Sequence, residues 1–274
     1  MYFQTKADIY ATLNRYTDAY NIYEIIKNTY AKFYGDNCLQ MSHVKMAEAS
    51  LLIQEGKITD ALLILENIQD KYFAIWGESS SQMLAIDNLL ASAYLQDSQV
   101  ERAKSLFVKA LEIAESNFGK NSAACISPLT GLGNFFLNFD VDLDMAKMYF
   151  NRASIASSFA FGSNHVNTQI IDASIANISL RQGKLQEAFK VFKRYLTTVQ
   201  QTLGSTSTAH TRLAEAYAYM GQYYLAKVSE AMSRGNELQK SENVNMALDY
   251  FKKANAVTEK IFGEKNVAYI SALV

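Results

Sequence analysis

Apolar residues in this chain recur at the spacing of amphipathic helices. Leu106, Phe107, Ala110, Leu111 and Ala114 follow the i, i+3, i+4, i+7 rule, so they share one helical face. The segment 188–196 repeats this spacing with alanine, phenylalanine and leucine. The pattern therefore predicts helices that bury one face.

The helical pattern also repeats at a constant interval. A large apolar residue followed by glycine ends each unit, and the intervals between these glycines are 42, 42, 43, 42 and 59 residues. The glycines are Gly35, Gly77, Gly119, Gly162, Gly204 and Gly263. An alanine lies sixteen residues before each one: Ala19, Ala61, Ala103, Ala146, Ala188 and Ala247. A small residue lies fourteen after the first five: Ala49, Ala91, Gly133, Ala176 and Ala218. Three markers in one frame predict a repeat array.

Each marker has a physical interpretation. The small residues allow two helices to cross closely. The glycine reaches a positive φ and ends the second helix of a unit. Good N-cap residues for the next helix follow it: Asn37, Ser79, Asn121, Asn164 and Thr206. The aromatic before the glycine is interpreted as a staple that packs the turn onto the core.

Each unit is thus predicted to be a helical hairpin. The first helices are expected at 2–14, 39–55, 80–96, 122–138, 164–181, 207–234 and 265–274. The second helices are expected at 17–33, 59–75, 101–117, 143–160, 186–202 and 244–261. The chain is predicted to be one domain, with repeats at about 1–35, 36–77, 78–119, 120–162, 163–204 and 205–263 and a partial seventh at 264–274.

Two segments carry a family resemblance. Residues 88–94, Asn-Leu-Leu-Ala-Ser-Ala-Tyr, and 183–188, Gly-Lys-Leu-Gln-Glu-Ala, resemble the two halves of a tetratricopeptide repeat. The 42-residue period and the 161–165 junction resemble the variant found in kinesin light chains. The histidine-proline that usually follows the junction glycine is absent, as are coiled-coil heptads. The resemblance implies an all-α, right-handed α-solenoid of about six helix-turn-helix repeats plus a partial seventh.

Two irregularities suggest partner contacts. The sixth unit is 17 residues longer than the 42-residue units, which predicts an overlong first helix and a projecting loop at 235–243. This is either a tolerated surface insertion or a contact involving Tyr223 and Tyr224. In the partial seventh repeat, an apolar face of Val267, Ile270 and Leu273 is expected to be covered by another chain or by further sequence.

Composition narrows the compartment and the partners. The formal net charge of -1 argues against nucleic-acid binding. Two cysteines without a paired framework favour a reducing compartment, and no apolar run is long enough to insert in a membrane. The N-terminal residues 1–6 lack the regions of a signal peptide. These features predict an intracellular, cytoplasmic protein, cytoskeletal or axonemal assemblies included.

No catalytic or metal-binding constellation is evident in the sequence. His43, His165 and His210 are far apart, and Cys38 and Cys125 occupy repeat and core positions. Gly131-Leu132-Gly133 follows no predicted strand, so it does not indicate a dinucleotide loop. We therefore expect no enzyme activity, no cofactor and no metal.

The resemblance places the first helices on the inner face of the stack, where partner segments would bind. The candidate groove residues are His43, Met46 and Ser50; Asn88, Ser92 and Gln96; Thr130, Asn134 and Asn138; Asn177 and Arg181; and Arg212, Glu215 and Tyr219. Amides can both donate to and accept from a peptide backbone. No basic cluster that would clamp a terminal carboxylate is present among them.

The leading hypothesis is a protein–protein interaction scaffold, a structural subunit of a multi-protein complex. The alternative is a reversible adaptor that captures peptides or helical segments in the groove. The remaining interpretation is that the groove residues are solvated and have no binding role.

Overall fold

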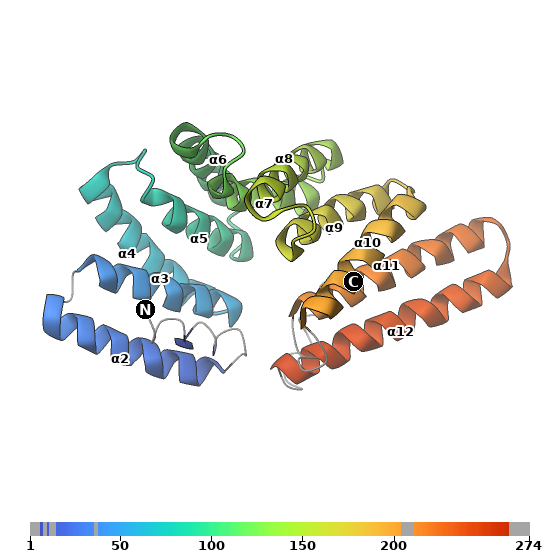
Figure 1. Ribbon diagram of the computed structural model, residues 1–274, viewed down its shortest axis with the longest axis horizontal. Coiled ribbons are helices and arrows are strands. Elements are labelled where there is room, and N and C mark those ends of the chain that lie inside the picture. The colour runs from blue at the N-terminus through green and yellow to red at the C-terminus, as the bar shows by residue number, and fades with distance from the viewer. Residues whose placement is uncertain (1–5, 8–9, 11–14, 36–37, 204–210, 263–274) are drawn as a thin grey trace. The chain divides into compact units, whose positions relative to one another are not determined.

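The computed structural model describes residues 6–7, 10, 15–35, 38–203 and 211–262, and its described regular structure is helical (Figure 1). The helices are α2 (Tyr16–Tyr34), α3 (Leu39–Gln54), α4 (Ile58–Trp76), α5 (Met83–Gln96), α6 (Val100–Phe118), α7 (Ile126–Asn138), α8 (Leu143–Phe161), α9 (Val166–Arg181), α10 (Leu185–Leu203), α11 (Thr211–Ser233) and α12 (Glu237–Phe262). A 3-10 turn, Ala123–Cys125, precedes α7. Consecutive helices pack in pairs, so the predicted helical-repeat solenoid class is confirmed.

The chain divides into two compact units, Met1–Ala156 and Ser157–Val274. In the first unit α3, α5 and α7 are the first helices of their hairpins, and α3 contacts α5 as α5 contacts α7. In the second unit α9 contacts α11 in the same way. Within each unit, first helices therefore lie beside first helices, as a repeat array requires.

The small residues lie where the helices approach most closely. Ala19, Ala61, Ala103, Ala146 and Ala188 have no exposed surface. A large residue twelve positions before the junction glycine fills the space between neighbouring helices, and five of these are almost fully buried: Tyr23, Leu65, Phe107, Phe150 and Phe192. A Cβ added at Gly131 or Gly133 would lie 2.3 Å from the Phe107 ring or 2.9 Å from the Phe150 ring. Small residues on first helices thus accommodate these large side chains.

The junction glycines act as predicted, but the capping residues differ. Gly35, Gly77, Gly119 and Gly162 have φ between 78° and 93°, a region that disfavours side chains. Ser79, Asn121 and Asn164, which were predicted as caps, precede the helices without capping them, whereas Asn37 and Thr206 lie outside the described residues. The third residue after the glycine takes that place in α9, where His165 Nδ1 accepts from the Asn167 N–H at 3.2 Å. The imidazole of His165 is therefore a structural cap.

The staple interpretation of the aromatic before the glycine is wrong for most units. Tyr34, Phe118 and Phe161 are 66, 54 and 48% exposed. Trp76 is half-buried and packs edge-on against Tyr72 at 4.8 Å. Tyr34 packs on Tyr30 at 6.1 Å and Phe161 stacks on His165 at 5.2 Å, but these contacts at the last helical turn do not bury the two rings in the core.

The sixth hairpin corrects the predicted loop. The connection between α11 and α12 is only residues 234–236, because α12 begins at Glu237. The Asn236 N–H donates to the Ala231 carbonyl at 3.0 Å, the same turn that Lys57 makes with Leu52 at 2.9 Å. The extra residues therefore lengthen the helices and do not form a 235–243 loop.

In this hairpin the two helices also approach most closely at a different residue from the predicted Ala218. The small residue that faces α12 is Gly221, where a Cβ would lie 2.7 Å from the Phe251 ring, whereas Ala218 is only half-buried. Gly221 comes seventeen residues after Gly204, and Gly133 comes fourteen after Gly119. From this contact to the turn, α11 and α12 each run seven residues further than α7 and α8. Relative to the 43-residue repeat of α7–α8, the sixth repeat therefore has three more residues before the contact and about two more helical turns in each helix, and its turn is one residue shorter.

Candidate protein-binding surface

The exposed face of the first helices recurs at fixed repeat positions. In α3, α5 and α7 the eighth and nineteenth residues after the junction glycine are exposed, and the fifteenth is half-buried or exposed. This surface, called the A-helix face below, carries His43, Ser50, Ser92, Gln96, Asn134 and Asn138 in the first unit. The periodicity of the helix thus brings the predicted residues of each helix to one side.

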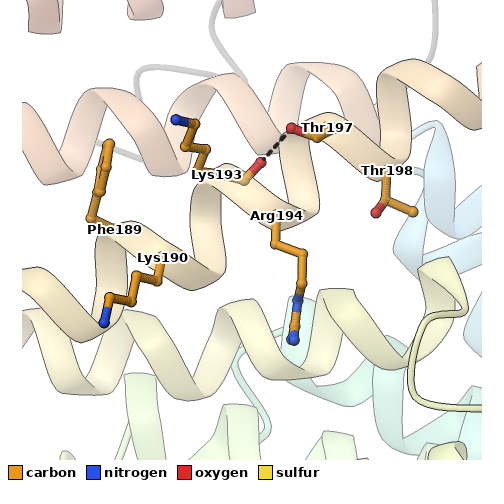
Figure 2. Close-up of a pocket in the computed structure, with 6 residues that line it drawn as sticks. All are labelled: Phe189, Lys190, Lys193, Arg194, Thr197 and Thr198. Atoms are coloured by element: carbon orange, nitrogen blue, oxygen red, sulfur yellow. Dashed lines mark hydrogen bonds between the residues drawn. The ribbon is translucent and has the colours of Figure 1, made fainter.

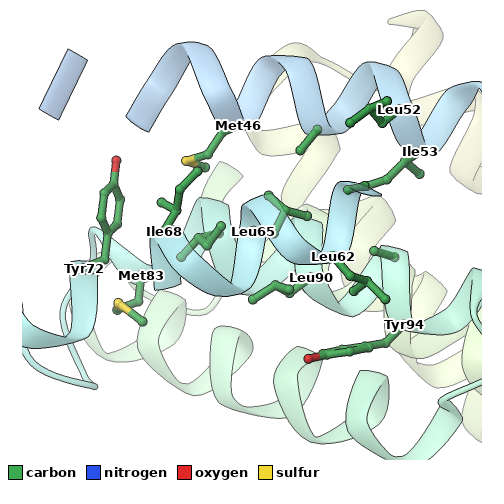
Figure 3. Close-up of a cluster of buried hydrophobic side chains, with 14 of the residues drawn as sticks. Met46, Leu52, Ile53, Leu62, Leu65, Ile68, Tyr72, Met83, Leu90 and Tyr94 are labelled. Carbon is green, nitrogen blue, oxygen red and sulfur yellow. The ribbon is translucent and has the colours of Figure 1, made fainter. Parts of the chain in front are cut away.

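Met46 does not belong to this face. It is only 8% exposed and lies in the core cluster with Leu65 and Ile68, towards which it points in Figure 3. The prediction that Met46 lines an accessible groove is therefore wrong. Its thioether fills space between α3 and α4, as methionine often does in a core.

Hydroxyl and amide groups of the predicted residues on the first helices differ in their availability. The Ser92 hydroxyl donates to the Asn88 carbonyl at 2.9 Å, and the Thr130 hydroxyl donates to the Ile126 carbonyl at 2.8 Å. Asn134 and Asn138 are exposed, while the Asn88 Oδ1 is buried without a hydrogen-bond partner among the described residues. The amides are thus the groups best placed to bind a peptide backbone.

In the second compact unit, Ser157–Val274, polar side chains form a denser cluster. Arg212 Nη2 donates to Asn167 Oδ1 at 2.9 Å, and the Tyr195 hydroxyl donates to Glu215 Oε2 at 3.3 Å. Burial raises the pKa of the Glu215 carboxyl to about 7, although the Tyr195 hydroxyl and Arg212 favour its charged form. Tyr219 stacks on Phe192 at 5.0 Å, and burial raises the pKa of its phenol. Arg212, Glu215 and Tyr219 are therefore held by tertiary contacts.

The remaining predicted residues are distributed differently. Asn177 is half-buried and Arg181 is exposed on α9. Tyr223 is 6% exposed and packs on Phe189 at 4.8 Å, so its predicted exposure is wrong. Tyr224 is half-buried and stacks on Tyr250 at 5.6 Å. The predicted contacts Val267, Ile270 and Leu273, and also His210, lie outside the described residues.

The sequence did not single out a set of large apolar side chains that stay exposed on the second helices and on the sixth hairpin. Five of the most exposed are Phe33, Leu63, Ile75, Phe159 and Leu238, at 66 to 81%. Leu63 and Met148 share one repeat position, and Phe33 and Ile75 share another. This recurrence was the available signal, but the helical pattern alone does not tell which apolar positions a neighbour will cover.

In the part of the chain that the structure describes, no three His, Cys, Asp or Glu side chains gather in a way that could hold a metal ion. The described helices include none that is long and apolar enough to cross a membrane. Cys125 is fully buried, as predicted, and Cys38 is half-buried.

Comparison with known proteins agrees with this arrangement. A tetratricopeptide repeat model matches residues 88–117, the α5–α6 hairpin, and no curated protein matches the sequence. The chain therefore contains a tetratricopeptide repeat at residues 88–117, and repeats of this class bind other proteins.

Its structural neighbours include kinesin-light-chain-like repeats. BtubC (BKLC) from P. vanneervenii shares 16% identity over 89% of this chain and 92% of its own, with a TM-score of 0.63. TPR-like repeats of a kinesin light chain from Podosopora anserina share 17% identity over 80% and 95%, with a TM-score of 0.55. The apo form of RapI shares 12% identity over 92% and 97%, with a TM-score of 0.58. At these identities the neighbours show the fold alone.

Proposed function

We propose that this protein is a structural scaffold that holds partner proteins over more than one surface. The observation that carries the proposal is the set of large apolar side chains left exposed away from the A-helix face. Leu63, Phe159 and Leu238 are 72, 81 and 72% exposed, and they come from α4, α8 and α12. Exposed apolar residues that recur on several elements favour contact with other proteins.

The energetics support stable contacts at these positions. Covering one such side chain contributes about 1.5 to 3 kcal/mol to association. The sixth hairpin has six exposed large apolar residues on its two helices: Leu225, Met232, Leu238, Val244, Met246 and Leu248. Some of its charges are paired internally, Lys227 with Glu230 at 2.8 Å and Lys240 with Glu237 at 2.9 Å. A partner would therefore meet exposed apolar side chains beside charges that are partly neutralised.

We place this scaffold inside the cell, as a subunit of a cytoplasmic assembly such as a cytoskeletal or axonemal one. Two cysteines without a disulfide support a reducing compartment. We assign no chemical step to any of the described residues, so the activity that we propose is protein binding.

Affinity purification of the tagged chain from its own cells tests the proposal. We expect partners that remain bound through size exclusion, and we expect the L238S/L248S variant to lose them. The N134A/N138A variant on the A-helix face is the matched control and retains them. A monodisperse monomer without bound partners from those cells contradicts the scaffold.

A second candidate function is the reversible capture of short peptides on the A-helix face. The exposed amides of Gln96, Asn134 and Asn138, one or two per first helix, favour it. Calorimetric titration with extended peptides is the test, and binding lost in Asn134→Ala but kept in L238S/L248S would favour this adaptor. The two variants therefore separate the two functions.

A further inference from the structure

Helix α10 carries a strip of cationic residues along a shallow hollow of about 460 Å³. The six lining residues are Phe189, Lys190, Lys193, Arg194, Thr197 and Thr198, all from this one helix (Figure 2). The opposite face of α10 is anchored in the core, where Phe192 and Tyr195 are fully buried. The strip is therefore held on a rigid helix and faces outward.

The cations of the strip differ in what they already bind. Lys190 and Lys193 are exposed and form no ion pair with a carboxylate in the described parts of the chain. Arg194 Nη2 bonds Asp172 Oδ2 on α9 at 2.9 Å, which orients the guanidinium. The Thr197 hydroxyl donates to the Lys193 carbonyl at 2.9 Å. The strip thus offers two unpaired positive charges beside a positioned third.

Spacing along the helix defines the ligand that would match. Lys190 and Arg194 are four residues apart, so their side chains leave α10 about 6 Å apart along its axis. Glutamates four residues apart on a partner helix have the same spacing. Phe189, half-buried against Tyr223, adds an apolar surface beside the charges, with the Lys193 ammonium 5.9 Å from its ring centre. An amphipathic acidic helix would satisfy both the charges and the apolar surface.

We propose that Lys190, Lys193 and Arg194 form a docking site for an acidic helical segment of a partner protein, separate from the A-helix face. We assign an acidic partner segment because its negative charge would complement these three cations. The cations form a local positive patch on a chain whose net charge is -1. Three cations on a single helix fall short of the extended basic surface that nucleic acid requires. Glu187, exposed one turn before Lys190, bounds the strip at its N-terminal end.

The test uses a fluorescein-labelled, alanine-based 16-residue helical peptide with glutamates at i, i+4 spacing. Fluorescence anisotropy with the full chain at 50 mM salt measures its affinity. We expect the K190E/K193E variant to bind about 20-fold more weakly, since each exposed ion pair contributes up to about 1 kcal/mol. The K32E/K120E variant changes the net charge equally at exposed sites on the first unit, and we expect its affinity to match the unaltered chain.

Three results would overturn the proposal. They are equal binding by K190E/K193E with an unchanged circular dichroism spectrum, equal binding of the glutamine version of the peptide, and loss of binding in N134A/N138A. Displacement of the peptide by short duplex DNA at a lower concentration than by unlabelled peptide would assign the strip to nucleic acid instead. Because L238S/L248S leaves the strip intact, failure here is distinguishable from failure of the scaffold.

Discussion

The α7–α8 hairpin and the α11–α12 hairpin pack their two helices through the same kind of contact but differ in length. In both, a glycine on the first helix lies against a phenylalanine on the second, Gly133 with Phe150 and Gly221 with Phe251. The same hydrogen-bonded turn closes α3–α4 and α11–α12. Beyond its contact, the sixth hairpin runs seven residues further on each side. Seven residues are about two turns, so the extension keeps the same faces opposed.

The comparison shows how a repeat array accepts an insertion. Matched whole turns leave the inward face of both helices inward, and Val228 and Ala231 are buried in the extension. Among the described residues no helix covers the outward face of the extension, and Met232 and Leu238 are 58 and 72% exposed. The insertion in the α11–α12 hairpin therefore keeps the packing of the core and adds exposed surface.

The largest expected effect separates the contact phenylalanines of the two hairpins. Phe150 is 1% exposed, whereas Phe251 at the corresponding position of the sixth hairpin is half-buried. We expect Phe150→Ala to lower the free energy of unfolding by about 4 kcal/mol and Phe251→Ala by about 2 kcal/mol. Urea unfolding followed by circular dichroism measures both, and equal losses would remove the distinction.

Glu215 makes the folding stability of the sixth repeat depend on pH. The corresponding positions elsewhere hold Met46, Asn88, Thr130 and Ala173, none of which is acidic. Its pKa in the folded protein is raised from 4.5 to about 7, so the folded state binds the proton more tightly. The stabilisation is therefore complete below about pH 4.5 and is lost as the pH rises through 7.

We expect the unaltered chain to lose about 2 kcal/mol more stability than Glu215→Gln between pH 5 and pH 8. Urea midpoints at four pH values measure the difference. Glu242→Gln, at an exposed site on α12, is the control and should follow the unaltered chain. Parallel curves for Glu215→Gln and the unaltered chain would show that this carboxyl does not couple to folding.

Shortening the sixth hairpin tests whether the extension is surface rather than core. Deleting residues 227–233 and 237–243 removes seven residues from each helix and keeps the turn at 234–236. We expect the fold to persist with a loss of only about 1 to 2 kcal/mol, because the extension packs mainly on itself. Thermal unfolding measures the loss, and collapse of the whole chain would contradict this interpretation.

The smallest expected effect concerns the turns. Val141 has φ of 53° between α7 and α8, where Gly56, Gly183 and Gly235 occupy the matching places in other hairpins. A β-branched residue is strained in this region, so Val141→Gly should stabilise the protein by about 1 kcal/mol. Val108→Gly inside α6 is the control and should destabilise by about 1 kcal/mol. Differential scanning calorimetry resolves the opposite signs.

Much of the fold was predictable because its signals are local. The junction glycines, the alanines of the close crossings and the three-residue hairpin turns all follow from spacing along the chain. The site was less predictable. Helical periodicity placed Asn134 and Gln96 on an exposed face, but the burial of Met46 and Tyr223 depends on neighbouring helices. The α10 strip was visible as Lys190, Lys193 and Arg194 at helical spacing, yet its meaning required knowing which face is outward.

By itself the sequence determined the array of helical hairpins, since small residues at a constant interval permit only a repeated close crossing. Tertiary structure decided that the 17 extra residues lengthen two helices instead of forming a loop. It also decided which apolar side chains stay exposed. The physical reason is that periodicity fixes the faces of a helix, whereas exposure depends on whether another helix of matching length lies beside that face.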